Sequence, residues 1–405
     1  MESTKRKNNS EKVEFKNSLF IDREALSVLA LAQNGLLHPV DKLMNSQEAK
    51  DTDKTKLYKN TTFPFSFVLA PSGKRNLKVM KSAKTGDKLD LIVEGVKEGE
   101  LIVEEAFPID RHQRIKNIYG TNDYSHPGVS DIFKRLGEYA ISGKFQVNNL
   151  KVKETLEKIK NIKKVLNAQK TTALMIGANP FHRGHEELIR TALEKTDLLV
   201  LFLLKPYERE NNKKSLSYEI RYKTVEHFIN NFIHKNKVVL VEFENSYIFA
   251  GFNEIILDAI VAKNYGCDTL IIGENHAGVG VYYDQNRYKS IVDYLQNIEI
   301  DIDIIPDFVH CSQCGGVIRK DICPHGQHNH IIYDSKIILE LYINGLIPPS
   351  VLVRPEISSI VISDLFPNRF ESIENIYDKM IPNNGLLERH NERDFYLSFL
   401  KLYSI

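Results

Sequence analysis

The second half of the chain alternates between short apolar stretches and longer stretches that have one polar and one apolar face. The apolar stretches lie at residues 171–177, 197–205, 237–244, 268–273 and 299–308. Helical periodicity fills the intervals, at residues 182–196, 215–233, 251–266 and 282–298. Strands that are apolar throughout and alternate with amphipathic helices are typical of a parallel sheet covered on both faces. The pattern therefore predicts a doubly wound α/β domain over residues 171–308.

Residues 18–150 have a different pattern, in which short apolar runs are interrupted by turn residues. Such runs occur at Phe63–Ala70, Lys88–Val96 and Glu100–Ile109. Runs of this length, bounded by Gly, Pro, Asn and Asp, predict a mostly β domain. A helical stretch in this region begins at Asp22 and ends at Gly35, and both residue types are favoured at those positions of a helix.

Four further segments complete the expected division of the chain. Residues 1–17 are polar, lack the apolar core of a signal peptide and are expected to form a flexible leader. Residues 151–170 are rich in lysine and have helical apolar spacing, so we expect a linker helix rather than a lipid or nucleic-acid site. A cysteine-rich segment follows at residues 309–333, and a helical region at residues 334–405.

Composition and charge add exclusions to this picture. The 405 residues are enough for two or three domains. Lys and Arg number 54 and Asp and Glu 53, so no overall field favours nucleic acid or an acidic membrane as a partner. No apolar run approaches the roughly 20 residues of a membrane span. We therefore expect a cytoplasmic protein, in which four cysteines do not indicate a disulfide framework.

Candidate chemistry begins where the first strand of the α/β domain meets its helix. The turn Gly177–Ala178–Asn179–Pro180 is followed by His182 and His185, which share one face of the helix. Backbone N–H groups and the helix dipole attract anions there, and imidazole N–H groups can stabilise charge that develops during nucleotidyl transfer. The Asn179 amide can donate as well. We interpret the turn as a nucleotide-phosphate site; a metal pair and a plain surface helix are the alternatives.

A second polar segment, Gly273–Gly280, follows the fourth predicted strand. The carboxyl ends of parallel strands share one edge of the sheet, where open α/β sheets bind their ligands. Glycines allow the backbone to approach a ligand closely. The residues of this segment expected at the binding edge are Gly273, Asn275, His276, Ala277 and Gly278.

Three cysteines lie close together near residue 315. Cys311 and Cys314 have the spacing of a zinc knuckle, and Cys323 follows within the same segment. The fourth ligand is open among His325, His328 and His330; we give His330 first, with His325 as the alternative. A structural zinc is the favoured interpretation, and thiol redox chemistry is the main alternative.

Several separated motifs, taken in order, resemble those of the ATP sulfurylase family, in its zinc-bearing branch. They lie at Asn34–Met44, Tyr119–Val129, Ala178–His185, Tyr247–Gly280 and Ile343–Ile357. The resemblance implies a PUA-like β domain followed by an α/β nucleotidyltransferase domain. It also implies transfer of AMP from ATP to sulfate with release of pyrophosphate, Mg²⁺ bound with ATP, and a homo-oligomer. His182, His185 and Asn179 would then act on the phosphates, and Gly273–Gly278 would hold the adenosine side.

The chain departs from this family at the site, including the two positions, Ile176 and Ala178, at which the resemblance implies contacts to sulfate. Ile176 and Ala178 stand where the family has Gln and Arg, and Glu274 and Asn275 stand where it has Arg and Asp. Charges about 4 Å apart in a partly buried site interact by roughly 4 kcal/mol, so losing cations and gaining an anion should weaken sulfate binding. Candidates for the acceptor site are therefore Ile176, Ala178 and Glu274, with Lys205 and Arg221 as compensating cations. A non-sulfate acceptor, or a nucleotide-binding protein without turnover, stays open.

Overall fold

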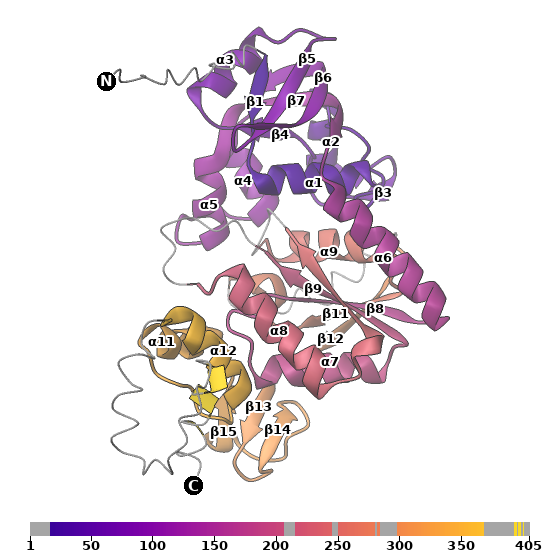
Figure 1. Cartoon of the computed structure of the whole chain (residues 1–405). Coiled ribbons are helices and arrows are strands. Elements are labelled where there is room, and N and C mark those ends of the chain that lie inside the picture. The colour runs from indigo at the N-terminus through magenta and orange to yellow at the C-terminus, as the bar shows by residue number, and fades with distance from the viewer. Residues whose placement is uncertain are drawn as a thin grey trace, which may run out of the picture.

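The computed structural model describes residues 17–205, 215–244, 250–279, 282–283 and 298–367, and five positions between 393 and 400. The described chain forms an N-terminal body and an α/β body, and helix α6 (Leu150–Leu166) runs between them (Figure 1). This helix covers most of residues 151–170, the segment in which we expect a linker helix. The expected leader, apart from residue 17, and nearly half of the expected C-terminal helical region at residues 334–405 lie outside the described residues.

The N-terminal body is built on one five-stranded sheet. Its strand order is β1 (Ser18–Phe20), β5 (Lys88–Val93), β6 (Val96–Pro108), β7 (Leu136–Val147) and β4 (Leu69–Pro71). The helices of this body are α1 (Arg23–Gln33), α2 (Ser46–Thr55), α3 (Lys74–Ser82), α4 (Arg111–Tyr119) and α5 (Pro127–Arg135), with a small hairpin of β2 (Leu57–Tyr58) and β3 (Thr61–Thr62). The helix expected from Asp22 is confirmed, because the Asp22 carboxylate accepts from the N–H of Ala25 at 2.8 Å.

One strand predicted for this body is wrong over most of its length. Of Phe63–Ala70, only Leu69 and Ala70 lie in a strand, β4. Phe63, Phe65 and Phe67 are buried in the core instead. Pro64 has no N–H to donate to a strand ladder, so the alternating phenylalanines fill the core from a loop.

The α/β body contains the predicted parallel sheet. Its order is β10 (Val238–Phe243), β9 (Leu198–Leu204), β8 (Thr171–Ile176), β11 (Thr269–Gly273) and β12 (Asp301–Ile305), and every neighbouring pair is parallel. Three predicted helices are confirmed as α7 (Arg183–Glu194), α8 (Tyr218–Phe232) and α9 (Phe252–Asn264). The helix predicted at residues 282–298 lies almost wholly outside the described residues.

Helices cover both faces of this sheet, as a doubly wound fold requires. Along β8, Ala173 and Met175 pack in the core shared with α9, whereas Leu174 and Ile176 pack in the core shared with α7 and α8. The chain runs outward from β8 through β9 to β10 and then returns past β8 to β11. The strand order therefore reverses between β8 and β11, where such sheets bind their ligands.

A small antiparallel sheet and two helices follow the α/β sheet. Strands β13 (Phe308–Cys311), β14 (Gly316–Arg319) and β15 (His330–Ile332) pair in the order β14-β13-β15, and we call these strands with their connecting loops the cysteine sheet. Helices α11 (Ser335–Ile343) and α12 (Pro355–Leu365) come next, and α12 packs against α8. Short 3-10 helices lie at η1 (Lys235–Lys237), η2 (His276–Gly278) and η4 (Gln327–Asn329).

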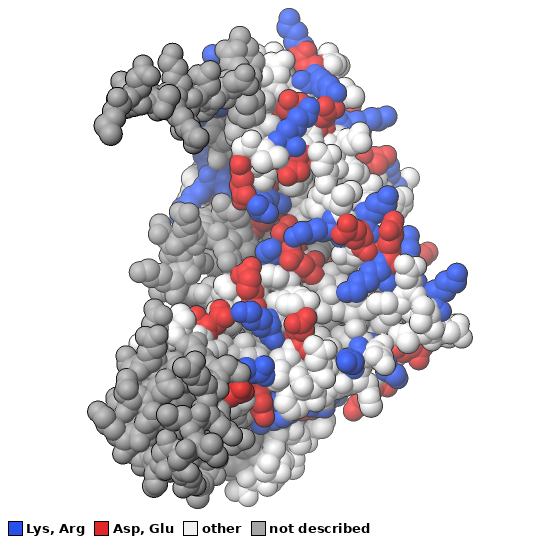
Figure 2. Space-filling model, in the orientation of Figure 1, with Lys and Arg blue, Asp and Glu red and all other residues white. Residues whose placement is uncertain are grey.

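The surface agrees with the near-zero net charge of the sequence. On the face shown in Figure 2, the basic and acidic side chains of the described residues are intermingled, with no large area of a single sign among them. Within the part of the chain that the structure describes, none of the helices has the length and apolar character needed to cross a membrane.

Candidate functional site

The two predicted histidines lie together at the start of α7, directly after β8. Their ring centroids are 3.8 Å apart, and only 7% of His182 is exposed. The backbone N–H of His182 donates to Nδ1 of His185 at 3.4 Å. The ring of Tyr333 stacks on that of His182 at 5.4 Å, and Oγ of Ser335 lies 3.2 Å from Nε2 of His182. The pair is thus held between α7 and the segment that follows β15.

Burial keeps both histidines neutral near pH 7. It lowers the pKa of His185 to about 4 and, together with the neighbouring His185, holds the pKa of His182 well below its usual value. A neutral imidazole offers one N–H donor and one acceptor. Nδ1 of His182 is buried and has no hydrogen-bond partner among the described residues. A polar atom in this state has unused hydrogen-bonding capacity, as expected at a ligand site.

Acidification is expected to destabilise the fold through this pair. Between about pH 6.5 and about pH 4, the unfolded histidines bind protons and the folded ones do not. The free energy of unfolding therefore decreases as the pH is lowered through this window. His185→Gln removes one such group and should reduce the slope of that free energy by up to about 1.4 kcal/mol per pH unit, as measured by urea unfolding. The exposed His234 provides the control His234→Gln, which should keep the slope. An unchanged slope in His185→Gln would contradict the burial argument.

The turn that precedes the histidines is held by the protein itself. Ala178 is buried with φ at 48°, in the left-handed region that is unfavourable for a residue with a Cβ atom. The Asn179 amide donates to Oγ of Ser215 at 3.0 Å, and its oxygen accepts from the N–H of Leu216 at 2.9 Å. Pro180 follows a cis peptide bond. Asn179, predicted to contact a phosphate, therefore ties the turn to the start of the α8 segment.

The second predicted segment lies beside the first. Strands β8 and β11 pair directly, with Leu174 opposite Ile271, so the residues that follow both strands meet at the same edge. Within this segment Ala277 has φ at 56° and Gly278 has φ at 76°. Nε2 of His276 lies 2.7 Å from Oδ2 of Asp258 on α9. Gly280, at the end of the predicted motif, lies outside the described residues.

The acceptor-site candidates have structural partners. Glu274 accepts from the N–H of Asp307 at 3.4 Å, and the Asn275 amide donates to the Asp307 carboxylate at 2.8 Å. Burial, followed by the neighbouring Glu274 charge, raises the pKa of Asp307. The predicted acceptor edge thus carries two neighbouring carboxylates.

The two compensating cations differ in position. The buried guanidinium of Arg221 donates to the carbonyl oxygens of Gly177 at 2.8 Å and Leu204 at 2.9 Å, so it reaches the first residue of the turn. Lys205 pairs instead with Glu242 at 3.2 Å and Glu244 at 3.6 Å. Ile176 is buried at the end of β8, within the core shared with α7.

Sequence reasoning missed the residues that enclose the histidine pair from the C-terminal side. Tyr333 and Ser335 contact His182, and Nε of Arg354 donates to both oxygens of the buried Glu186, the residue after His185, at 2.9 and 2.7 Å. Gly184 lets Tyr333 approach, since a Cβ atom there would lie 3.2 Å from the Tyr333 ring. Glu186 is an acidic residue in the first turn of α7, which is a common signal of a helix start. Its partner Arg354 lies 168 positions away in the sequence, so local sequence could not reveal the pair.

The three predicted cysteines come together in the cysteine sheet with His325. The donor atoms of Cys311, Cys314, Cys323 and His325 all lie within 4.8 Å of one another. Nδ1 of His325 is 3.5 Å from the Cys311 sulfur and 3.3 Å from the Cys314 sulfur, and the sulfurs of Cys314 and Cys323 are 3.9 Å apart. A tetrahedral zinc ion would separate sulfur from nitrogen by about 3.5 Å and sulfur from sulfur by about 3.8 Å. The donor set therefore fits a tetrahedral zinc ion.

His325, and not the first candidate His330, contributes the fourth donor atom of this group. Nε2 of His330 lies 3.2 Å from the Cys323 sulfur, where the ring can support that sulfur from outside the donor set. His330 is paired with Cys311 across β13 and β15, so its backbone position is set by the strand register. His328 contacts Asn329.

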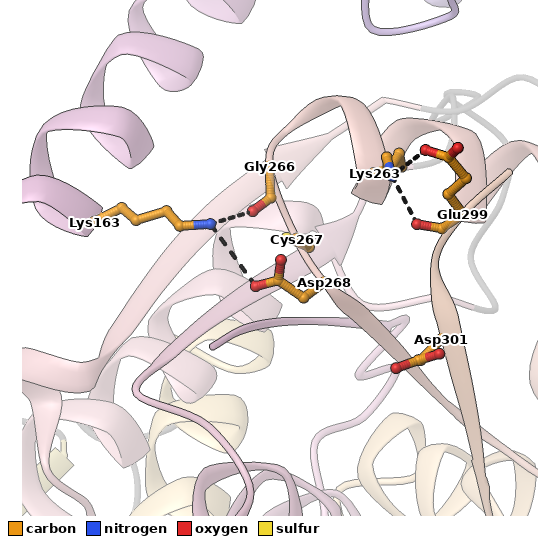
Figure 3. A pocket seen from close by; sticks show the side chains of 7 residues that line it. All are labelled: Lys163, Lys263, Gly266, Cys267, Asp268, Glu299 and Asp301. Carbon is orange, nitrogen blue, oxygen red and sulfur yellow. Dashed lines mark hydrogen bonds and ion pairs between the residues drawn. The ribbon is translucent and has the colours of Figure 1, made fainter. Parts of the chain in front are cut away.

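A hollow of about 410 Å³ lies at the opposite edge of the α/β sheet, near the amino ends of β11 and β12 (Figure 3). The lining residues are Lys163, Lys263, Gly266, Cys267, Asp268, Glu299 and Asp301. Lys163 donates to the carbonyl of Gly266 at 2.7 Å, and Lys263 pairs with Glu299 at 3.2 Å. The two lysines of this hollow are paired, and parallel sheets bind ligands at the carboxyl ends of their strands. The edge between β8 and β11, where the strand order reverses, is therefore the better candidate for a ligand site.

Comparison with known proteins bears on this arrangement. Residues 151–364, more than half of the chain, match the family described as ATP-sulfurylase. The chain belongs to the ATP-sulfurylase family. Residues 1–150 match a PUA-like domain. The predicted order of domains, a PUA-like domain and then an α/β nucleotidyltransferase-like domain, is thereby confirmed.

This chain is similar to members of the family over most of their length. The chain is 28% identical to the sulfate adenylyltransferase of Halothermothrix orenii over 363 residues, which are 86% of this chain and 91% of the relative. It is 30% identical to that of Ignicoccus hospitalis over 292 residues, 70% and 75% of the two chains. Among solved structures, a hexameric APS kinase from Thiobacillus denitrificans aligns with a TM-score of 0.64 at 15% identity, over 85% of this chain and 62% of that chain. At this identity, the solved structure supports the fold alone.

Proposed function

We propose that this chain is a nucleotidyltransferase of the ATP sulfurylase type, which transfers AMP from ATP to sulfate or a related oxyanion and releases pyrophosphate. The observation that carries the proposal is the pair His182 and His185, buried and neutral at the start of α7. The pair lies at the point where the strand order reverses, next to the segment after β11. Membership of the family and the names of its relatives support the same activity.

In the proposed reaction, an acceptor oxygen attacks the α-phosphorus of ATP in line, and the bond to the bridging oxygen of pyrophosphate breaks. The imidazole N–H groups and the amino end of α7 stabilise the negative charge that develops on the phosphates. Gly177, Ala178 and Pro180 shape the turn around the phosphates, with Asn179 close to the α-phosphate, while Gly273–Gly278 hold the adenosine side. Mg²⁺, bound with ATP, supplies further neutralisation of phosphate charge.

For the cysteine sheet, we propose one structural zinc ion held by Cys311, Cys314, Cys323 and His325. Four protein ligands close the coordination sphere, which is the arrangement of structural rather than catalytic zinc. The ion would fix the short strands of this sheet and, through β15, the segment that carries Tyr333 and Ser335 to the histidine pair.

The identity of the acceptor is the part of the proposal with a specific rival. Glu274 and Asp307 place two carboxylates at the predicted acceptor edge, and Ile176 and Ala178 offer no charge there. These features favour, as the second candidate, the same nucleotide chemistry with an acceptor that is less anionic than sulfate or carries a cationic group.

A panel of acceptors separates the two candidates. The purified chain is supplied with ATP or CTP and, in separate reactions, with sulfate and other oxyanions, and pyrophosphate release is measured. Release with sulfate, at a high KM, supports the first candidate. Release with another acceptor alone supports the second. Saturable ATP binding without release in any reaction would contradict both and leave a nucleotide-binding protein.

We further propose a cytoplasmic homo-oligomer. The resemblance to the family supports the oligomer, and cysteines suited to a metal rather than to disulfides support the compartment. Light scattering from the purified chain tests the oligomer, since a mass near the 46.5 kDa of one chain would contradict it.

A further inference from the structure

Helix α9 carries two buried carboxylates among apolar side chains. Glu254 is 1% exposed and Asp258 is 0% exposed, and the two lie four residues apart on one face. Removing an ionised carboxylate from water is unfavourable unless partners compensate it. Oδ2 of Asp258 lies 2.7 Å from Nε2 of His276, and this contact compensates part of the cost of burial. Oδ1 of Asp258 is buried without a hydrogen-bond partner among the described residues. Because the burial of Asp258 is only partly compensated, we ask what this carboxylate contributes to the neighbouring site.

His276 stands in a segment whose backbone is conformationally unfavourable. The next residue, Ala277, has φ at 56°, in the left-handed region that is unfavourable for a residue with a Cβ atom. Such conformations persist only where the surroundings enforce them. Two contacts from the α9 side do so: Gly251 N–H donates to the Ala277 carbonyl at 3.1 Å, and Asp258 holds the preceding side chain.

We propose that Asp258 is a positioning residue for the nucleotide segment Gly273–Gly278. Its carboxylate accepts the Nε2–H of His276 and fixes the imidazole against α9, and this contact keeps Ala277 in the left-handed conformation in which the segment meets the nucleotide. Asp258 transfers no proton and touches no substrate in this account. The inference rests on the proposed function only in taking the segment as part of the nucleotide site.

Glu254 has a different partner, although its carboxylate lies near the pair. Its Oε2 accepts from the N–H of Ala250 at 3.0 Å, just before α9 begins. The donor atoms of Glu254, Asp258 and His276 lie within 4.8 Å of one another, so a divalent cation is the rival explanation of the buried charge.

The test measures binding of a non-hydrolysable ATP analogue to the full chain by calorimetry. Asp258→Asn keeps an oxygen acceptor of the same size and should bind within about threefold of the wild type. Asp258→Leu and His276→Gln should each weaken binding about tenfold, and the double variant should be no weaker than either one, because the two residues act through one contact. Asp364→Leu on α12, where Asp364 pairs with Lys223, is the control and should bind normally.

Several results would overturn the inference. Wild-type affinity in Asp258→Leu, or losses in the double variant that multiply to about a hundredfold, would show that Asp258 does not act through His276. A divalent metal bound to the wild type at one equivalent beyond the cysteine-cluster ion, and lost in Asp258→Asn, would replace positioning with a metal site. If Asp258→Leu does not fold, a tenfold loss in Asp258→Asn overturns the hydrogen-bond account by itself.

A spectroscopic measurement separates this inference from the proposed function. In ¹⁵N-histidine spectra of the wild type, His276 should show a protonated, hydrogen-bonded Nε2, and Asp258→Leu should change that signal while Asp364→Leu leaves it unchanged. If the wild type binds no ATP analogue, the proposed function fails, and this signal still decides whether Asp258 orients His276. An identical His276 signal in wild type and Asp258→Leu would overturn the inference.

Discussion

Replacing His182 with alanine is expected to slow pyrophosphate release from ATP by about 10²- to 10³-fold, the usual cost of losing one donor to a developing negative charge. The residue is buried beside His185 and next to the amino end of α7, so water cannot easily take over its hydrogen bond. ATP binding should weaken much less, because the lost interaction strengthens only as the transition state forms. Pre-steady-state release of pyrophosphate, measured beside calorimetric ATP binding, separates the two effects.

Two variants control this experiment. His182→Gln keeps an N–H donor and should recover part of the lost rate, whereas His234→Ala removes an exposed histidine and should keep the full rate. Thermal unfolding shows whether His182→Ala retains its fold despite the space left beside Tyr333. A folded His182→Ala protein with the wild-type rate would exclude this histidine from the chemistry.

Removing the proposed zinc ion from the cysteine sheet is expected to unfold that sheet and abolish activity with it. Strands of four, four and three residues cannot bury enough apolar surface to be stable alone. Metal binding supplies about 10–16 kcal/mol in isolated zinc fingers, so much of the stability of this sheet should come from the ion. Because β15 leads directly to Tyr333 and Ser335, the histidine pair should lose its cover at the same time. We expect the melting temperature to fall by roughly 10 °C.

Metal analysis, calorimetry and activity should change together in Cys314→Ser. Wild-type protein purified without chelator should carry one zinc ion per chain, and Cys314→Ser should carry much less. The fourth cysteine of the chain, the buried Cys267, lies outside the cluster, so Cys267→Ala should retain zinc and activity. Metal-free wild-type protein with an unchanged melting temperature would refute the structural role.

Most features that followed from local sequence were predicted well, with the strand expected at Phe63–Ala70 as an exception. Uniformly apolar strands marked the parallel sheet, because burial on both faces leaves no room for alternation. The same pattern predicted that His182 and His276 follow β8 and β11, because the carboxyl ends of parallel strands lie at one edge of the sheet. The cysteine spacing indicated the cluster, but several histidines follow Cys323 within a few residues, and only the folded loop selects His325.

The features that were missed depend on contacts between distant residues. Ser335 lies 153 positions from His182, and Arg354 is as remote from Glu186. In the sequence, nothing distinguishes Asp258 from the other polar residues of its helix. Its contact with His276 exists only because α9 packs against the segment after β11. The left-handed backbone at Ala178 and Ala277 is equally invisible, because alanine gives no signal for that conformation.

Identification of the products made from ATP and sulfate tests the central claim most directly. Mass spectrometry of a reaction with the full chain should find adenylylated sulfate and pyrophosphate in equal amounts, with no ADP, since the bond at the α-phosphorus is the one that breaks. ADP with orthophosphate, or ATP that is bound but unchanged whichever acceptor is present, would contradict nucleotidyl transfer at the histidine pair.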